Sequence, residues 1–218
     1  MDFLDLQNST AYFLDDLQFG YFTPTQIKLW INNAQKEVQK RLLKSGNNHY
    51  LRCVTTTLVV NQNDYVLPLD FKHLHRLEVI ISGTAPNESA SPILPITLNQ
   101  TDLVDNTVGT PAVYYFKRNR LVLEPAPDTA LILRMWYSYE VAELVLDSDE
   151  PDVPTAYQEL IPLLAAEDGF IKDGRVSGLL EKKLKEFQKD MDSDAQERNK
   201  DVPRGIVETG FSGGGFYY

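Results

Sequence analysis

The spacing of apolar residues changes twice along this chain, and that double change restricts its fold more than any other feature. Residues 2–17 and 24–45 carry apolar side chains three or four positions apart, which is typical of helices with one buried face. From about 50 to 145 the chain has β-branched and aromatic runs separated by Pro, Gly and Asn, which is typical of strands and turns. Helical spacing returns from Tyr157 to Phe170 and again over 176–197. The sequence therefore predicts helices on both sides of a β-rich segment.

The second helix has the clearest boundaries. Thr23 is placed to cap it, Pro24 suits the first helical position, and Gln26 completes a capping box. Gly46 is expected to end the helix. The apolar stripe between these limits consists of Ile27, Trp30, Ile31, Ala34, Val38 and Leu42. In a later helix, Pro162 falls inside the apolar pattern and is expected to kink or break it.

The β-rich segment predicts several short strands. A hairpin is expected with its tip near Lys117, Arg118 and Asn119, and Pro125 should end its second strand. The polar, proline-containing stretch 82–92 is expected to be a loop. The candidate strands are 50–60, 76–82, 112–117, 120–124 and 131–140.

These elements predict an α+β fold in which N- and C-terminal helices close on one another as a helical bundle, with an inserted β-rich lobe and an extended C-terminal tail. The expected division is 1–48 and 147–198 for the helical bundle, 49–146 for the lobe, and 199–218 for the tail.

Charge and composition exclude several classes of protein. Acidic residues outnumber basic ones by 31 to 21, a net charge of −10, which disfavours a groove that grips nucleic acid through its phosphates. The same charge suits a surface that DNA slides past without binding, although solubility alone also explains it. No apolar run approaches the ~20 residues of a membrane-spanning helix. The N-terminus lacks a secretory signal pattern, so a cytoplasmic location is expected.

Metal and catalytic chemistry find little support in the sequence. Cys53 is the only cysteine, which excludes an internal disulfide and a zinc site built on several cysteines. His73 and His75 would share one face of a strand, but no third ligand is placed near them, so structural roles are favoured. Carboxylates for glycoside cleavage could be drawn from many of the acids, such as Glu167 and Asp168. Adjacent positions on a helix do not face each other, so buried or intersubunit salt links are favoured for this pair.

An acidic cluster precedes the third helical segment. It lacks the glycine and glutamate of an EF-hand loop, so we expect it to complement the positive end of the helix dipole and to aid solubility. Its members are Asp147, Asp149, Glu150 and Asp152.

The end of the chain is the most distinctive segment. Three consecutive glycines in FSGGGFYY (211–218) are flanked by four aromatic side chains, which would expose apolar area if they were left in water. Upstream lie a basic turn at Arg204 and an apolar pair that begins at Ile206. Aromatic anchors on an adaptable segment are typical of a docking tail.

Three strings of the sequence resemble the head-to-tail adaptor, or head-completion, proteins of tailed bacteriophages, most of all those with short, podovirus-type tails. The resemblance spans about residues 23–200. The strings are DYVLPLDFKHL (64–74), GTPAVYYFKRNRLVLEPAPDTALILRMWY (109–137) and VPTAYQELIPLLAAEDGFIKDGR (153–175), followed by a long polar helix.

The resemblance implies a ring of copies of this chain, commonly twelve, at the portal vertex of the virion. Such a ring joins the portal protein to the tail nozzle or tube proteins and extends the DNA channel for genome retention and ejection, without sequence-specific DNA binding. Neither an enzymatic activity nor a cofactor, a metal or a membrane partner is expected. The lobe would face the tail, and the C-terminal segment would reach the portal. The expected portal contacts are Arg204, Ile206, Phe211, Phe216, Tyr217 and Tyr218.

Three alternatives stay open at the level of sequence. A tail-tube, nozzle or baseplate ring protein would share the acidity, the strands and the docking tail. A cell-wall glycan hydrolase carried with the tail would need a partner for Glu167 or Asp168. A carbohydrate- or protein-binding module would need an aromatic platform, for which Trp136, Tyr137 and Tyr139 are the candidates.

Overall fold

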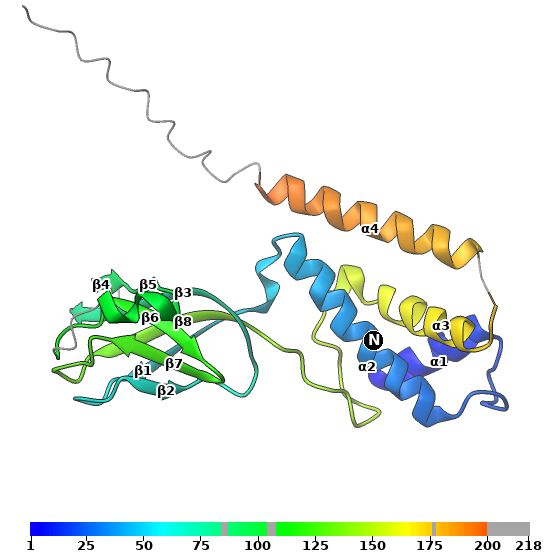
Figure 1. Ribbon diagram of the computed structural model, residues 1–218. Helices are drawn as coiled ribbons and strands as arrows, with labels where there is room; N and C mark the ends of the chain where they lie inside the picture. The colour runs from blue at the N-terminus through cyan, green and yellow to red at the C-terminus, as the bar shows by residue number, and fades with distance from the viewer. Residues whose placement is uncertain (84–86, 104–107, 176–177, 200–218) are drawn as a thin grey trace, which may run out of the picture.

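A computed structural model describes residues 1–83, 87–103, 108–175 and 178–199, and this part of the chain has an α+β fold (Figure 1). Its α-helices are α1 (Phe3–Leu14), α2 (Pro24–Lys44), α3 (Leu160–Lys172) and α4 (Gly178–Asn199). Short 3-10 helices occupy Asn48–Tyr50, Leu98–Leu103 and Thr155–Tyr157. The helices gather at one end of the elongated molecule and the strands at the other (Figure 1). The α+β class expected from the sequence is thus confirmed.

Helix α2 begins and ends where the sequence predicts. The Thr23 side chain accepts a hydrogen bond from the backbone N–H of Gln26, and the Gln26 side chain accepts one from the N–H of Thr23, which completes the capping box. Pro24 is the first helical residue. The chain leaves the helix through Gly46, whose φ of +77° suits glycine. All six predicted stripe residues are buried.

Helix α1 is shorter than the predicted 2–17. It ends at Leu14 because Asp15 adopts a left-handed conformation, with φ of +58°. The Asp16 carboxylate then organises the following turn by accepting hydrogen bonds from the backbone N–H groups of Gly20, Tyr21 and Phe22, at 2.8, 3.0 and 2.7 Å. These bonds, led by that from Phe22, hold the pKa of Asp16 below its usual value near 3.8.

The prediction that Pro162 kinks or breaks a helix is wrong. The chain forms a 3-10 turn at Thr155–Tyr157, and α3 begins afterwards at Leu160. Pro162 is therefore the third residue of α3, in the first turn, where the backbone N–H groups have no partner within the helix. The missing N–H of proline costs no helical hydrogen bond at this position.

Helix α3 is the centre of the helical core. Eight of its 13 residues are buried, and α1, α2 and α4 all pack against it. Gly169 allows α1 and α2 to come close, since a Cβ atom there would lie 2.6 Å from Leu14 Cδ2 and 3.3 Å from Trp30. Helix α4 packs on the same core through Leu180, Leu184, Phe187 and Met191, the stripe that the sequence predicts.

The strands form two four-stranded sheets within the described residues. The first has the order β1 (Leu51–Thr57), β8 (Ile132–Tyr139), β3 (Phe71–Ser82), β4 (Ser89–Pro92). The second has the order β2 (Asp64–Val66), β7 (Arg120–Glu124), β6 (Val113–Lys117), β5 (Leu94–Pro95). All pairings are antiparallel except that of β5 with β6.

The predicted hairpin is present, because Lys117 pairs with Arg120 across the turn and Arg118 has a φ of +56°. The stretch 82–92 is not entirely a loop, since β4 occupies its last four residues and pairs with β3. β2 and β5 are further strands that the sequence pattern does not predict. Both are very short, so neither shows a recognisable alternation.

Strand β1 is an open edge of the first sheet. It pairs with β8 in unbroken register from Leu51–Ser138 to Thr57–Ile132, whereas the pairing of β3 with β8 contains two irregularities. Five of its seven residues are exposed. Among the residues that the structure describes, no other strand pairs with β1, so every second backbone N–H and C=O points outward.

Polar contacts join the lobe to the helical part. Tyr139, at the end of β8, packs against both the helical core and the core between the sheets. Its hydroxyl donates to Asp152 at 2.8 Å, and the Arg52 guanidinium lies 4.1 Å from its ring centre. Arg52 also pairs with Asp70, which accepts a hydrogen bond from the Tyr137 hydroxyl at 2.9 Å. Burial, aided by Asp152, raises the pKa of Tyr139 to about 12.

Candidate assembly surfaces

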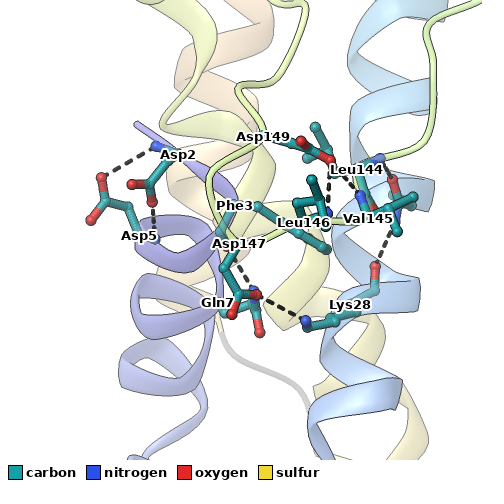
Figure 2. Close-up of polar contacts among 11 residues, drawn as sticks. Asp2, Phe3, Asp5, Gln7, Lys28, Leu144, Val145, Leu146, Asp147 and Asp149 are labelled. Atoms are coloured by element: carbon teal, nitrogen blue, oxygen red, sulfur yellow. Dashed lines mark hydrogen bonds and ion pairs between the residues drawn. The ribbon is translucent and has the colours of Figure 1, made fainter.

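The acidic connector after β8 clamps the start of α1 (Figure 2). The backbone N–H of Phe3 donates to the carbonyl oxygen of Asp149 at 2.8 Å. The backbone N–H of Leu4 donates to the carbonyl oxygen of Asp147 at 3.0 Å. The first N–H groups of a helix have no partner within it, so these contacts supply one. The connector thereby fixes how α1 lies against the rest of the helical part.

Side chains strengthen the same clamp. The Asp147 carboxylate lies 2.9 Å from Lys28 Nζ on α2 and accepts a hydrogen bond from Gln7 Nε2 on α1 at 3.1 Å (Figure 2). Lys28, followed by Gln7, holds the pKa of Asp147 below its usual value. One carboxylate therefore ties two helices to a segment more than 100 residues away.

The helix-dipole interpretation of this acidic cluster is wrong. The first turn of α3 contains no acidic residue, and the side chain of its N-cap residue, Glu159, makes no capping hydrogen bond. Asp149 instead accepts the backbone N–H groups of Val145 and Leu146 in its own connector, both at 2.8 Å (Figure 2). Asp152 binds Tyr139 of the lobe.

An apolar tip lies at the end of the helical part away from the lobe (Figure 1). Asp16 fixes the turn between α1 and α2, and the Tyr21 hydroxyl donates to Asp173 after α3 at 2.7 Å. Leu17, Tyr21 and Ile171 are 64, 67 and 69% exposed here. Large apolar side chains held in a fixed loop are typical of a protein contact surface.

A groove runs along the side of α4 that faces α1 and α3, and is called the α4 groove below. Its two adjoining hollows measure about 480 and 400 Å³. Phe13, Leu163, Phe170 and Phe187 line it, while Glu159 and Asp190 stand at its rim together with Lys183 and Glu186. At the end of the groove near Glu159, three carboxylates therefore lie beside aromatic walls, together with two cations, Lys183 and the amino group of Met1.

A second cleft, of about 720 Å³, lies on the other side of α4 against α2 and α3. Its lining mixes acidic side chains, among them Glu37 and Glu167, with the basic Arg41, Lys44 and Lys185. Helix α4 consequently rests on one apolar stripe with open space along both flanks.

The tip of the β6–β7 hairpin is basic. Lys117, Arg118 and Arg120 are all exposed, next to Phe116, which is 44% exposed. Arg120 pairs with Asp64, whereas Lys117 and Arg118 make no ion pair with any residue that the structure describes. A free positive charge on an acidic protein is a candidate contact for an acidic partner.

The candidates for catalysis or metal binding do not assemble into a site. The rings of His73 and His75 contact each other edge to face, and His75 Nε2 is hydrogen-bonded to the Ser138 hydroxyl. Burial raises the pKa of Asp168, but neither Asp168 nor Glu167 forms an ion pair within the described residues. A buried salt link of this pair is therefore not seen among the described residues, and an intersubunit link stays a prediction. The described residues also hold no group of three or more His, Cys, Asp or Glu arranged for a metal ion.

The aromatic platform that a binding module would need is not formed. Tyr137 is buried in the core between the sheets, with 1% of its surface exposed. Tyr139 is engaged at the junction with the helices, and Trp136, one position before Tyr137 on a strand, faces the opposite side of the sheet from it.

The six residues predicted to contact the portal lie outside the described residues. They are Arg204, Ile206, Phe211, Phe216, Tyr217 and Tyr218. The tip, the α4 groove and the role of Asp16 were not predicted, although the aromatic run from Tyr12 to Phe22 is a signal that could have directed attention to the tip.

A comparison of the sequence with models of protein families gives a match that covers most of the chain. The model of the SU10 adaptor protein family matches residues 1–206. This chain belongs to that family. It is therefore a bacteriophage adaptor, a structural protein of tail assembly, as the resemblance predicts. A comparison with curated proteins gave no match. Within the described residues, no helix is long and apolar enough to cross a membrane.

Proposed function

We propose that twelve copies of this adaptor form a ring that joins the portal to the tail and extends the DNA channel. Membership of the SU10 adaptor family carries this proposal. In this proposal the role of the chain is structural, as the family's description as an adaptor protein suggests.

In this ring the helical parts lie side by side as bundles and the lobes face the nozzle or tube proteins. Two features favour that orientation. The molecule is elongated, with the lobe at one end and the apolar tip at the other (Figure 1). The contacts around Tyr139 join the two parts, so a partner at one end would be held in a defined position relative to the other.

The C-terminal residues Arg204, Ile206, Phe211, Phe216, Tyr217 and Tyr218 dock on the portal in this proposal. Their aromatic and apolar character supports it. Residues 147–198 carry 14 acidic and seven basic side chains, and an acidic ring lets DNA slide past without sticking.

Imaging tests the orientation. Cys53 on β1 is the only cysteine and is exposed, so maleimide-linked gold marks the lobe. We expect twelve labels per ring on the tail side of purified particles. Labels on the portal side would reverse the proposed orientation, and labels away from the vertex would refute the proposed location.

Deletion of residues 211–218 tests the docking tail. The truncated protein is expected to lose attachment to isolated portal while its thermal unfolding is unchanged. Attachment equal to that of the full chain would refute portal docking by these aromatics.

A further inference from the structure

Two surfaces of the subunit are complementary to each other, and one belongs to the lobe whereas the other belongs to the helical part. The first is the basic hairpin tip, with Phe116, Lys117 and Arg118, and the second is the α4 groove. The hairpin presents a partly exposed aromatic ring beside two exposed positive charges. The groove presents aromatic walls beside the exposed acids Glu159 and Asp190.

The charges that would meet have no ion-pair partner among the residues that the structure describes. Lys117 and Arg118 make no ion pair among the described residues, and the same is true of Glu159 and Asp190. An ion pair formed on association gives each of these charges a partner and fixes how the two surfaces align. The groove also offers apolar surface, so the hairpin would bury Phe116 in the same step.

The position of the hairpin indicates which protein it meets. Phe116 lies 5.8 Å, ring centre to ring centre, from Phe71, and Phe71 pairs with Tyr139 at the junction of the two parts. The hairpin tip is therefore at the waist of the elongated subunit, between its two ends. Portal and tail approach the ends of a ring, whereas the waist faces the neighbouring copies.

We propose that the β6–β7 hairpin of one subunit docks in the α4 groove of the next subunit, with Lys117 and Arg118 against Glu159 and Asp190. This inference rests on the proposed ring. Two different surfaces of the same chain make a heterologous contact, which closes into a ring when the rotation between copies is right. Helix α4 packs on the helical core through a single apolar stripe, so the groove beside that stripe stays open within one subunit. In the proposed ring, the hairpin of the neighbouring subunit fills it.

Cross-linking tests the contact in the presence of portal. In a Cys53→Ser background, one preparation carries Arg118→Cys and a second carries Asp190→Cys. Mixed on isolated portal rings and treated with a short bismaleimide, they are expected to give covalent heterodimers. Ile81→Cys, at the far end of β3, replaces Arg118→Cys as the control and is expected to give none. Portal-bound protein without the Arg118–Asp190 cross-link would overturn the proposal.

Charge exchange tests the same contact independently. Lys117→Glu with Arg118→Glu is expected to weaken ring formation on portal about tenfold, because like charges then meet. Adding Glu159→Lys and Asp190→Lys should restore it. Lys44→Glu with Lys189→Glu changes the net charge equally at two exposed positions outside the α4 groove, and is the control that should not weaken assembly.

The outcomes separate this inference from the proposed function. Normal rings from the Lys117→Glu, Arg118→Glu variant would overturn hairpin docking and leave the adaptor ring intact. Wild-type protein that binds neither portal nor tail would overturn the proposed function itself.

Discussion

The hydrophobic cores of the helical part and of the lobe are built in different ways. In the helical part, α3 is buried on most of its surface and the other helices cover it, so each contributes a stripe that repeats every three or four residues. In the lobe, the core lies between two sheets whose strands are short and whose neighbours are often distant in sequence, as with β1 and β8. The comparison teaches that the first core depends on local periodicity and the second on long-range pairing.

The two tryptophans allow this comparison to be tested, because Trp30 lies on α2 and Trp136 lies on β8. A Trp136→Phe variant reports on the helical part by fluorescence, and a Trp30→Phe variant reports on the lobe. Each variant below can be measured in both backgrounds.

The largest effect is expected from Ile161→Ala, since Ile161 is fully buried at the start of α3. The cavity should lower the free energy of unfolding by about 4 kcal/mol. Urea unfolding followed through Trp30 should show this shift, and the Trp136 signal should shift less. Equal shifts in both signals would mean that the two parts unfold as one unit.

Leu123→Ala is the matching change in the lobe, where Leu123 on β7 is fully buried between the sheets. We expect a loss of about 3 kcal/mol, read mainly through Trp136. Val66→Ala, at an exposed position on the neighbouring strand, is the control and should change little. A larger shift of the Trp30 signal would contradict the separation of the two cores.

Leu184→Ala addresses α4, which rests on the helical core through one stripe. Leu184 keeps 8% of its surface exposed, so the expected loss is smaller, about 2 kcal/mol. Limited proteolysis should cut α4 sooner in this variant than in the exposed control Lys185→Ala. Unchanged proteolysis would show that α4 is held by contacts other than its stripe.

Thr23→Ala removes the cap of α2 and should cost about 1 kcal/mol, measured by thermal unfolding. Thr25→Ala, two residues on and exposed, is the control, with an expected effect within about 0.5 kcal/mol. Equal effects of the two changes would deny that the cap matters.

Asp147→Asn is expected to have the smallest effect at neutral pH and to change the response to acid. Lys28 and Gln7 lower the folded-state pKa of Asp147 below 3.8, so its stabilisation is present above the unfolded value and is lost as pH falls through the folded one. Thermal unfolding between pH 7 and pH 2.5 should therefore decline less in Asp147→Asn. Glu150→Gln, in the same connector, is the control. Identical acid profiles of Asp147→Asn and the wild type would contradict the role of Asp147.

Sequence reasoning succeeded wherever the signal is local. The capping box of α2, the stripe of α4 and the turn at Arg118 each depend on residues a few positions apart, and the structure confirms all three. The proline in α3 misled because its effect depends on where the helix begins, which the apolar pattern alone does not define.

The rest depends on contacts between distant residues. Strand β4 lies in a polar stretch and exists because β3 pairs with it, and Asp147 acts on residues more than 100 positions away. Of the candidate surfaces, the hairpin tip could be predicted from its turn residues. The α4 groove could not, since it forms only when α1, α3 and α4 come together.

The open edge of β1 has a consequence for the protein before assembly. A seven-residue strand without a bulge, a proline or a charge beyond Arg52 is a template on which another strand can add. Copies that accumulate without portal would then associate through their lobes as their concentration rises, and would be lost to aggregates. Thr55→Lys would place a charge on this edge and discourage the association. The longer a subunit stays unassembled in an infected cell, the more its open edge exposes it to aggregation.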